Sequence, residues 1–168
     1  MDQLKFRNVL LKTAFATMAC DGHIDQREID ELCSINEKTR YFDGIKFRKV
    51  LDDLISDFRK GSGSAIKHIL DEVLECDMSP IQELLALEVS IRIINSDGKH
   101  DENEVRFIHA LRSKLNLANE VIFDRFGALP ILNISEKSEI SSSQNTIKKY
   151  EFPELTETSG YDFSRLNQ

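Results

Sequence analysis

The feature that most constrains this chain is a motif that occurs twice, 76 residues apart (97 − 21). Residues 21–28 read Asp-Gly-His-Ile-Asp-Gln-Arg-Glu and residues 97–104 read Asp-Gly-Lys-His-Asp-Glu-Asn-Glu. The same offset aligns apolar residues on both sides of the motif: Leu11 with Leu87, Phe15 with Ile91, Met18 with Ile94, Ile29 with Val105 and Leu32 with Ile108. Self-similarity at a fixed spacing marks a repeated supersecondary unit. The sequence therefore predicts a duplicated unit of helix, tight Asp-Gly turn and second helix.

Apolar residues recur at helical spacing along most of the chain. Leu4, Leu11, Phe15 and Met18 fit a period of about 3.6 residues and predict a helix over residues 4–20, with these side chains on its buried face. The same pattern predicts further helices over about 25–36, 47–58, 66–74, 79–94, 105–115 and 118–126. No strand pattern interrupts the series. We expect an all-α fold, a single bundle of about seven helices with an internal pseudo-two-fold duplication.

Local signals at helix ends support this reading. Ser79, Pro80 and Gln82 have the order of a capping residue, a first-turn proline and a reciprocal capping side chain. Asp25 and Glu28 have the spacing of a capping box, and Asp43 is a candidate cap for the helix from residue 47. The stretch 61–64, Gly-Ser-Gly-Ser, is expected to end that helix.

The composition fits one folded body followed by a tail. A chain of 168 residues that is 40% hydrophobic can bury one core but is short for two domains. We expect a helical domain over residues 1–130 and a polar tail over residues 131–168. The tail carries spaced aromatic residues between Tyr150 and Phe163. These aromatic residues either dock on a groove of this or another protein or stay unbound.

Charge and cysteine usage narrow the class of protein. The formal net charge is -7, with 29 Asp and Glu against 22 Lys and Arg, which argues against a nucleic-acid partner. Charges interrupt every apolar run before it reaches bilayer-spanning length, and the first residues do not have the profile of a signal peptide. We expect a cytoplasmic protein that does not insert into membranes. Cys20, Cys33 and Cys76 lack metal-ligand spacing and are expected to be reduced, buried thiols.

The two acidic loops have two interpretations that compete for the same oxygen atoms. Asp-Gly turns and acidic capping boxes join helices without any ligand. Carboxylates and turn carbonyls also suit hard divalent cations. A complete EF-hand is excluded, because its first and third ligand positions fall on Thr17 and Ala19 in one copy and on Ile93 and Asn95 in the other. A metal site would have to take ligands from both copies.

Chain direction makes such sharing feasible. If the helices alternate up and down, the turns after the first and fifth helices lie at the same end of the bundle. An acidic patch would form there, and it would cost stability without a cation or a basic partner. We hypothesise a site for a divalent cation, calcium or magnesium more than zinc, built from Asp21, Asp25, Glu28, Asp97, Asp101 and Glu104.

Motifs typical of enzymes are missing from the sequence. It contains no zinc-protease helix motif, no glycine-rich phosphate loop, no hydrolase nucleophile elbow and no di-iron pair. His23, His68, His100 and His109 show no spacing that pairs them with a nucleophile. We therefore expect a protein that is not an enzyme, although a site assembled from distant residues stays open.

Residues 16–28 and their repeat at 95–104 resemble the TerB-like family, named from bacterial tellurite-resistance clusters. The similarity covers about residues 4–117. It implies a pseudo-symmetric helical bundle, acidic surface residues that bind divalent metal, and an accessory role with protein partners in stress response or phage defence. His100 departs from the pattern, because Ile24 occupies the matching position in the first copy; a solvent-facing side chain is expected, and a ligand is the alternative. The related co-chaperone branch does not apply, because the chain has no His-Pro-Asp motif.

A second hypothesis needs no metal. In it the acidic loops only cap helices, and the protein is an interaction adaptor whose tail, residues 131–168, docks on a larger partner.

Overall fold

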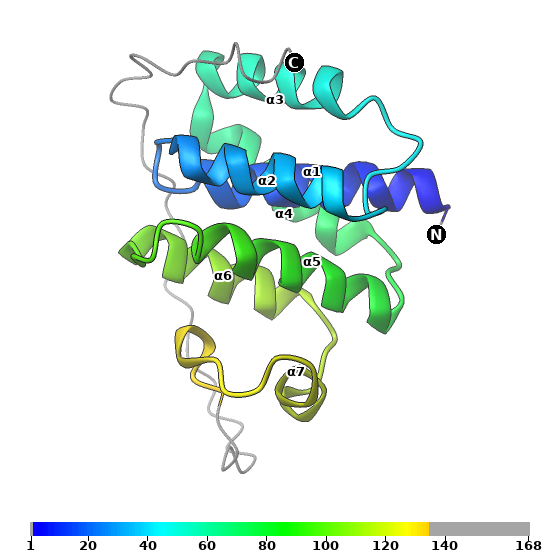
Figure 1. Ribbon diagram of the computed structural model, residues 1–168, viewed down its shortest axis with the longest axis vertical. Helices are drawn as coiled ribbons and strands as arrows, with labels where there is room; N and C mark the ends of the chain where they lie inside the picture. Colours follow the sequence, from blue (N-terminus) through cyan, green and yellow to red (C-terminus); the bar gives the residue numbers. More distant parts are fainter. Residues whose placement is uncertain (1, 135–168) are drawn as a thin grey trace.

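In the computed structural model the described part of the chain, residues 2–134, consists of helices without a β-strand. The helices are α1 (Gln3–Ala19), α2 (Gln26–Lys38), α3 (Phe47–Lys60), α4 (Ser62–Glu75), α5 (Pro80–Ile94), α6 (Glu102–Lys114) and α7 (Asn119–Phe126), followed by the 3-10 helix η1 (Pro130–Leu132). Figure 1 shows α3 along one edge of the bundle, α7 and η1 along the opposite edge, and α2 and α5 between them. The predicted all-α fold is confirmed over these residues.

The duplication is preserved in three dimensions. α6 begins and ends 76 residues after α2, and α1 and α5 occupy the same part of the repeat. The two copies meet where α1 packs on α5, the most extensive contact between described helices. At this contact Thr17 Oγ1 and Ser90 Oγ are hydrogen-bonded at 3.0 Å, and both side chains are buried. The turns after α1 and α5 lie at the same end of the bundle, as predicted, because residues of both line one cavity.

The start of α5 follows the sequence signals closely. The Ser79 hydroxyl accepts a hydrogen bond from the Gln82 N–H at 3.4 Å, and the Gln82 side chain accepts from the Ser79 N–H at 2.9 Å. Pro80 occupies the first turn, where its missing N–H has no helical partner to lose. This capping box uses a neutral glutamine, whereas the boxes that begin α2 and α6 use Glu28 and Glu104.

The predicted cap of α3 is wrong. Lys46 is the N-cap of α3, and no side chain caps this helix start. Asp43 lies in the preceding turn instead, where its carboxylate accepts from Arg40 Nε at 2.8 Å and its carbonyl accepts from Arg7. Asp43 therefore accepts hydrogen bonds from arginine side chains and does not cap the N–H groups of α3.

The stretch after α3 is also more helical than expected. α3 continues to Lys60, and α4 begins at Ser62, so only Gly61 separates the two helices. Gly61 is the N-cap of α4, and no side chain caps this helix start. Ser64 Oγ donates to the Gly61 carbonyl at 3.2 Å.

The core lies around α1. Leu11, Phe15 and Met18 are buried, as the helical spacing predicts, and Phe15 meets Phe58 of α3 edge to face at 5.8 Å between ring centroids. The prediction for Leu4 is wrong: its side chain lies at the α2–α3 turn beside Gly44 and stays 47% exposed. The first turn of α1 therefore lies beside a turn and not under another helix, and it stays largely exposed.

The described chain ends in a short packed segment after α7. Gly127 ends α7 with a positive φ of 72°, which favours glycine. Leu129 and Ile134 then exchange backbone hydrogen bonds of 2.9 and 3.1 Å around η1. Leu132 and Ile134 are buried, so the packed body extends to Ile134. The rest of the predicted tail, residues 135–168 with its aromatic residues, lies outside the described residues.

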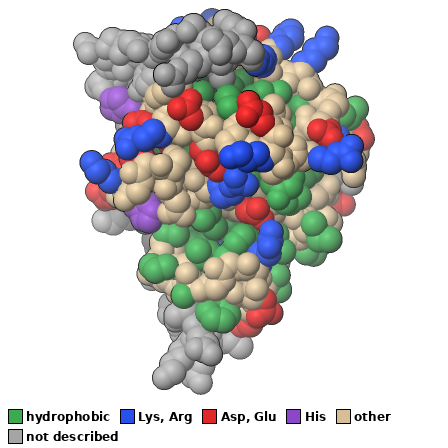
Figure 2. Space-filling model, in the orientation of Figure 1, with side chains coloured by type: hydrophobic (Ala, Val, Ile, Leu, Met, Phe, Trp, Pro, Cys, Tyr) green, Lys and Arg blue, Asp and Glu red, His purple; other side chains and the backbone are tan. Residues whose placement is uncertain are grey.

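Charged side chains of both signs alternate on the face formed by α2 and α5 (Figure 2). Arg92 of α5 pairs with Glu31 of α2 at 2.9 Å, and Arg125 of α7 pairs with Glu88 of α5 at 2.6 Å. Within residues 2–134, no helix combines the length and the apolar character that crossing a bilayer requires. The three cysteines are free thiols; Cys20 is buried, whereas Cys33 and Cys76 are partly exposed.

Candidate functional site

The turn between α1 and α2 is held by carboxylate oxygens that accept backbone N–H groups. Asp21 Oδ1 accepts from the His23 N–H at 2.7 Å across Gly22, whose φ of 89° suits glycine. Asp25 Oδ1 accepts from the Arg27 N–H at 2.8 Å, and Glu28 Oε2 accepts from the Asp25 N–H at 2.9 Å. The predicted capping box at Asp25 and Glu28 is confirmed.

The turn between α5 and α6 repeats these bonds one by one. Asp97 Oδ1 accepts from the Lys99 N–H at 2.8 Å across Gly98, which has a φ of 73°. Asp101 Oδ1 accepts from the Asn103 N–H at 2.7 Å, and Glu104 Oε2 accepts from the Asp101 N–H at 2.7 Å. The same sequence pattern thus gives the same loop twice.

The two turns lie side by side and enclose an open cavity of about 560 Å³. All six predicted acidic residues line it, so the expected convergence of the two copies is found in the described structure. Four further residues complete the lining: His23, Gln26, Lys99 and His100. We refer to this cavity as the acidic pocket.

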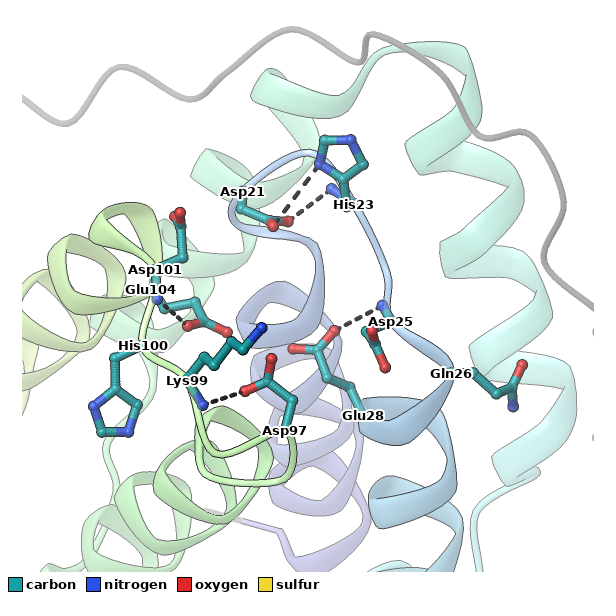
Figure 3. A pocket seen from close by; sticks show the side chains of 10 residues that line it. All are labelled: Asp21, His23, Asp25, Gln26, Glu28, Asp97, Lys99, His100, Asp101 and Glu104. Carbon is teal, nitrogen blue, oxygen red and sulfur yellow. Dashed lines mark hydrogen bonds and ion pairs between the residues drawn. The ribbon is translucent and has the colours of Figure 1, made fainter.

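The side chains of the acidic pocket do not all point the same way. In Figure 3 the carboxyl groups of Glu28, Asp97 and Glu104 turn toward the middle of the pocket, and the Lys99 side chain extends across it. The Asp101 carboxylate turns away. Glu28, from the first copy, therefore faces Asp97 and Glu104 of the second.

Burial raises the pKa of two of these carboxyl groups. Glu28 is only 6% exposed, and desolvation raises its pKa to about 9, with further increases from the negative charges of Glu104 and Asp21. Desolvation also raises the pKa of Glu104 to about 7, with contributions from Asp97 and Asp21. Without a bound metal ion, Glu28 is therefore protonated at neutral pH.

The neighbouring residues Cys20 and Asp21 also have raised pKa values. Burial raises the pKa of the Cys20 thiol well above its usual range, and the charges of Asp21, Glu104 and Glu28 add to this effect. Burial is likewise the main cause of a raised pKa at Asp21. A thiol of this kind is a poor nucleophile, because the thiolate is the reactive form.

The basic side chain of Arg27 connects the two acidic turns. Arg27 Nε and Nη2 each lie 3.0 Å from an oxygen of Asp25, and Nη2 lies 3.8 Å from Asp97 Oδ2. The hydrogen bonds from Arg27 lower the pKa of Asp25. The matching residue in the second copy is Asn103, which carries no charge. Arg27 therefore neutralises part of the outer pocket, whereas Glu28 and Glu104 lie deeper in it.

The two histidines sit in different surroundings. His23 Nδ1 lies 3.8 Å from Asp21 Oδ2. His100 is exposed, as expected, and its Nε2 lies 2.8 Å from Asn95 Oδ1. Both imidazoles line the acidic pocket. Their place there could not be predicted from the sequence, because a single histidine beside a turn has no ligand spacing.

The donor set of the pocket suits a hard cation. Carboxylate oxygens are the ligands that calcium and magnesium prefer, and the residues available to hold such an ion are Glu28, Asp97 and Glu104, with Asp21 nearby. In the arrangement seen for residues 2–134, no three Asp, Glu, His or Cys side chains already form a metal-ligand group. Binding would therefore require these carboxylates to move closer together.

Comparison of the chain with protein-family models, with curated proteins and with solved structures finds no match.

Proposed function

We propose that this protein is a non-enzymatic accessory module that binds one divalent cation in the acidic pocket. Both copies of the duplicated loop supply carboxylates, and the ion would lie between Glu28, Asp97 and Glu104. The resemblance to TerB-like proteins supports the same reading and adds a role with a protein partner in bacterial stress response or defence.

The observation that carries the proposal is the acidic character of two capping residues that need no charge. Gln82 performs the same reciprocal capping at the start of α5 with a neutral amide. At the matching places in α2 and α6 the chain has Glu28 and Glu104, and the ionised forms of these two side chains would repel each other in a partly buried pocket. A bound cation would stabilise both ionised carboxylates, whereas capping alone needs no charge at either position.

The carboxylate-rich lining favours calcium or magnesium over zinc, because thiolate ligands are missing from the pocket lining and the imidazoles lie at its sides. Cation binding should also displace the proton that Glu28 holds at neutral pH. The measured affinity is therefore expected to increase between pH 6 and pH 9.

The test is a calorimetric titration of the full chain, after chelator treatment, with calcium, magnesium, manganese and zinc in turn, alongside thermal unfolding. We expect heat and a rise in melting temperature with at least one of the hard cations. The change Glu104→Gln should weaken this binding while keeping the cap, and Glu102→Gln is the matched control, because exposed Glu102 pairs with Arg106 and does not line the pocket.

Two results would overturn the proposal. One is the lack of both heat and thermal shift with all four cations. The other is equal binding by the Glu104→Gln and Glu102→Gln variants, which would assign the cation to another place on this acidic surface.

A further inference from the structure

A second open cavity, of about 430 Å³, lies along α3 and is lined by Asp52, Ile55, Ser56, Arg59 and Lys60. These residues recur every three to four positions, with Ile55–Ser56 and Arg59–Lys60 as adjacent pairs, so they follow one stripe of the helix. α3 forms an edge of the bundle in Figure 1. We refer to this cavity as the α3 groove.

The α3 groove combines an apolar floor with a basic end. Ile55 provides the floor, and the aliphatic stems of Arg59 and Lys60 extend the apolar surface while their charged ends stay exposed. Asp52 is the acidic lining residue, and Lys60 pairs with Asp57 at 3.3 Å. That pair is more than two-thirds exposed on both sides and is therefore weak. An acidic segment with aromatic side chains fits this surface.

The chain itself contains such a segment outside the described residues. Residues 150–163 read Tyr-Glu-Phe-Pro-Glu-Leu-Thr-Glu-Thr-Ser-Gly-Tyr-Asp-Phe, with four acidic residues, four aromatic residues and no basic residue. Its charge is opposite to that of α3 with its N-cap, residues 46–60, which carry five basic and three acidic residues.

The connection between the two is long enough. The described chain ends at Ile134, and 15 residues (135–149) separate it from Tyr150. Such a connection spans up to about 50 Å when extended, whereas a folded body of this size has a radius of gyration of about 14 Å. A tethered segment also has an effective concentration of roughly millimolar, which exceeds that of most separate partners.

We propose that residues 150–163 bind in cis to the α3 groove, with an aromatic side chain against Ile55 and the acidic side chains beside Arg59 and Lys60. This contact is independent of cation binding at the acidic pocket. It would keep the aromatic residues of the tail covered until a competing surface takes them.

Limited digestion of the full chain with chymotrypsin tests the contact, because this protease cleaves after tyrosine and phenylalanine and its rate follows the population of the unbound segment. The variant Arg59→Glu/Lys60→Glu should be cleaved within residues 150–163 roughly threefold faster or more. The matched control is Arg48→Glu/Lys49→Glu, which makes the same charge change at the other end of α3 and should be cleaved at the wild-type rate. Equal rates for all three proteins, or equal acceleration in both variants, would overturn the proposal.

A second measurement leaves α3 unchanged and alters the tail. In methyl spectra of the full chain, Phe152→Ser/Phe163→Ser should shift the Ile55 methyl resonances and leave those of Ile29, buried in α2, in place. An unchanged Ile55 signal would contradict binding in the α3 groove. This readout remains decisive if the charge-reversal variants fail to fold.

Discussion

At the scale of single residues, Glu28 combines a structural and a chemical role. Its carboxylate accepts the Asp25 N–H, and its burial opposite Glu104 raises its pKa to about 9. Because this value lies above the ordinary 4.5, the folded state holds the proton over a pH range in which the unfolded chain has released it. The contribution of Glu28 to stability is therefore complete below about pH 4.5 and is lost as pH rises to about 9.

We predict that Glu28→Gln removes this loss. Glutamine keeps the capping acceptor, as Gln82 does in α5, and carries no charge. In urea unfolding with chelator present, the wild-type protein should lose at least about 1 kcal/mol more stability between pH 5 and pH 9 than the variant. Parallel pH profiles for the two proteins would contradict the assignment.

The acidic residues of the pocket could be predicted from the sequence, but the other residues that line it could not. The repeated Asp, Asp and Glu positions were visible because duplication and capping both leave a sequence pattern. Lys99 and Arg27 were not predicted to take part, because their places depend on where long side chains turn after the loops have met. Leu4 shows the same limit, since helical spacing does not reveal which neighbour covers a first turn.

At the scale of elements, the Asp-Gly turns set the positions of α2 and α6. Gly98 has a φ of 73° and open space where a side chain would begin, so a substitution there costs backbone strain without a clash. We predict that Gly98→Ala lowers the free energy of unfolding by about 1 kcal/mol. Gly98→Asn should cost less, because asparagine tolerates this conformation.

Chemical denaturation of the two Gly98 variants checks this prediction. If both variants lost the same amount of stability, and more than is predicted for Gly98→Ala, the cause would be a steric clash at the turn. No loss in either variant would show that the turn does not need glycine.

The prediction of elements succeeded where a helix end has its own chemical signature. The start of α5 follows from Ser79, Pro80 and Gln82, and that of α2 from Asp25 and Glu28. The start of α3 could not be predicted in the same way, because the Asp43 carboxylate pairs with Arg40 in the same turn and the Asp43 carbonyl accepts from Arg7 of α1. A competing local ion pair, together with one contact from α1, outweighed the capping preference there.

At the scale of the whole molecule, the duplication brings two loops to one end of the bundle. The contact of α1 with α5 fixes their spacing, and the acidic pocket forms between them. Each loop alone lacks the ligands of a complete calcium loop, so we infer that one ion is shared by both copies.

The stoichiometry of cation binding tests this claim most directly. In calorimetric titrations at pH 8, the wild-type chain should bind one divalent ion in the acidic pocket. Glu28→Gln and Glu104→Gln, from different copies, should each weaken that single event roughly tenfold or more. Two ions per chain, with each variant losing only one of them, or binding that neither variant changes, would contradict a shared site.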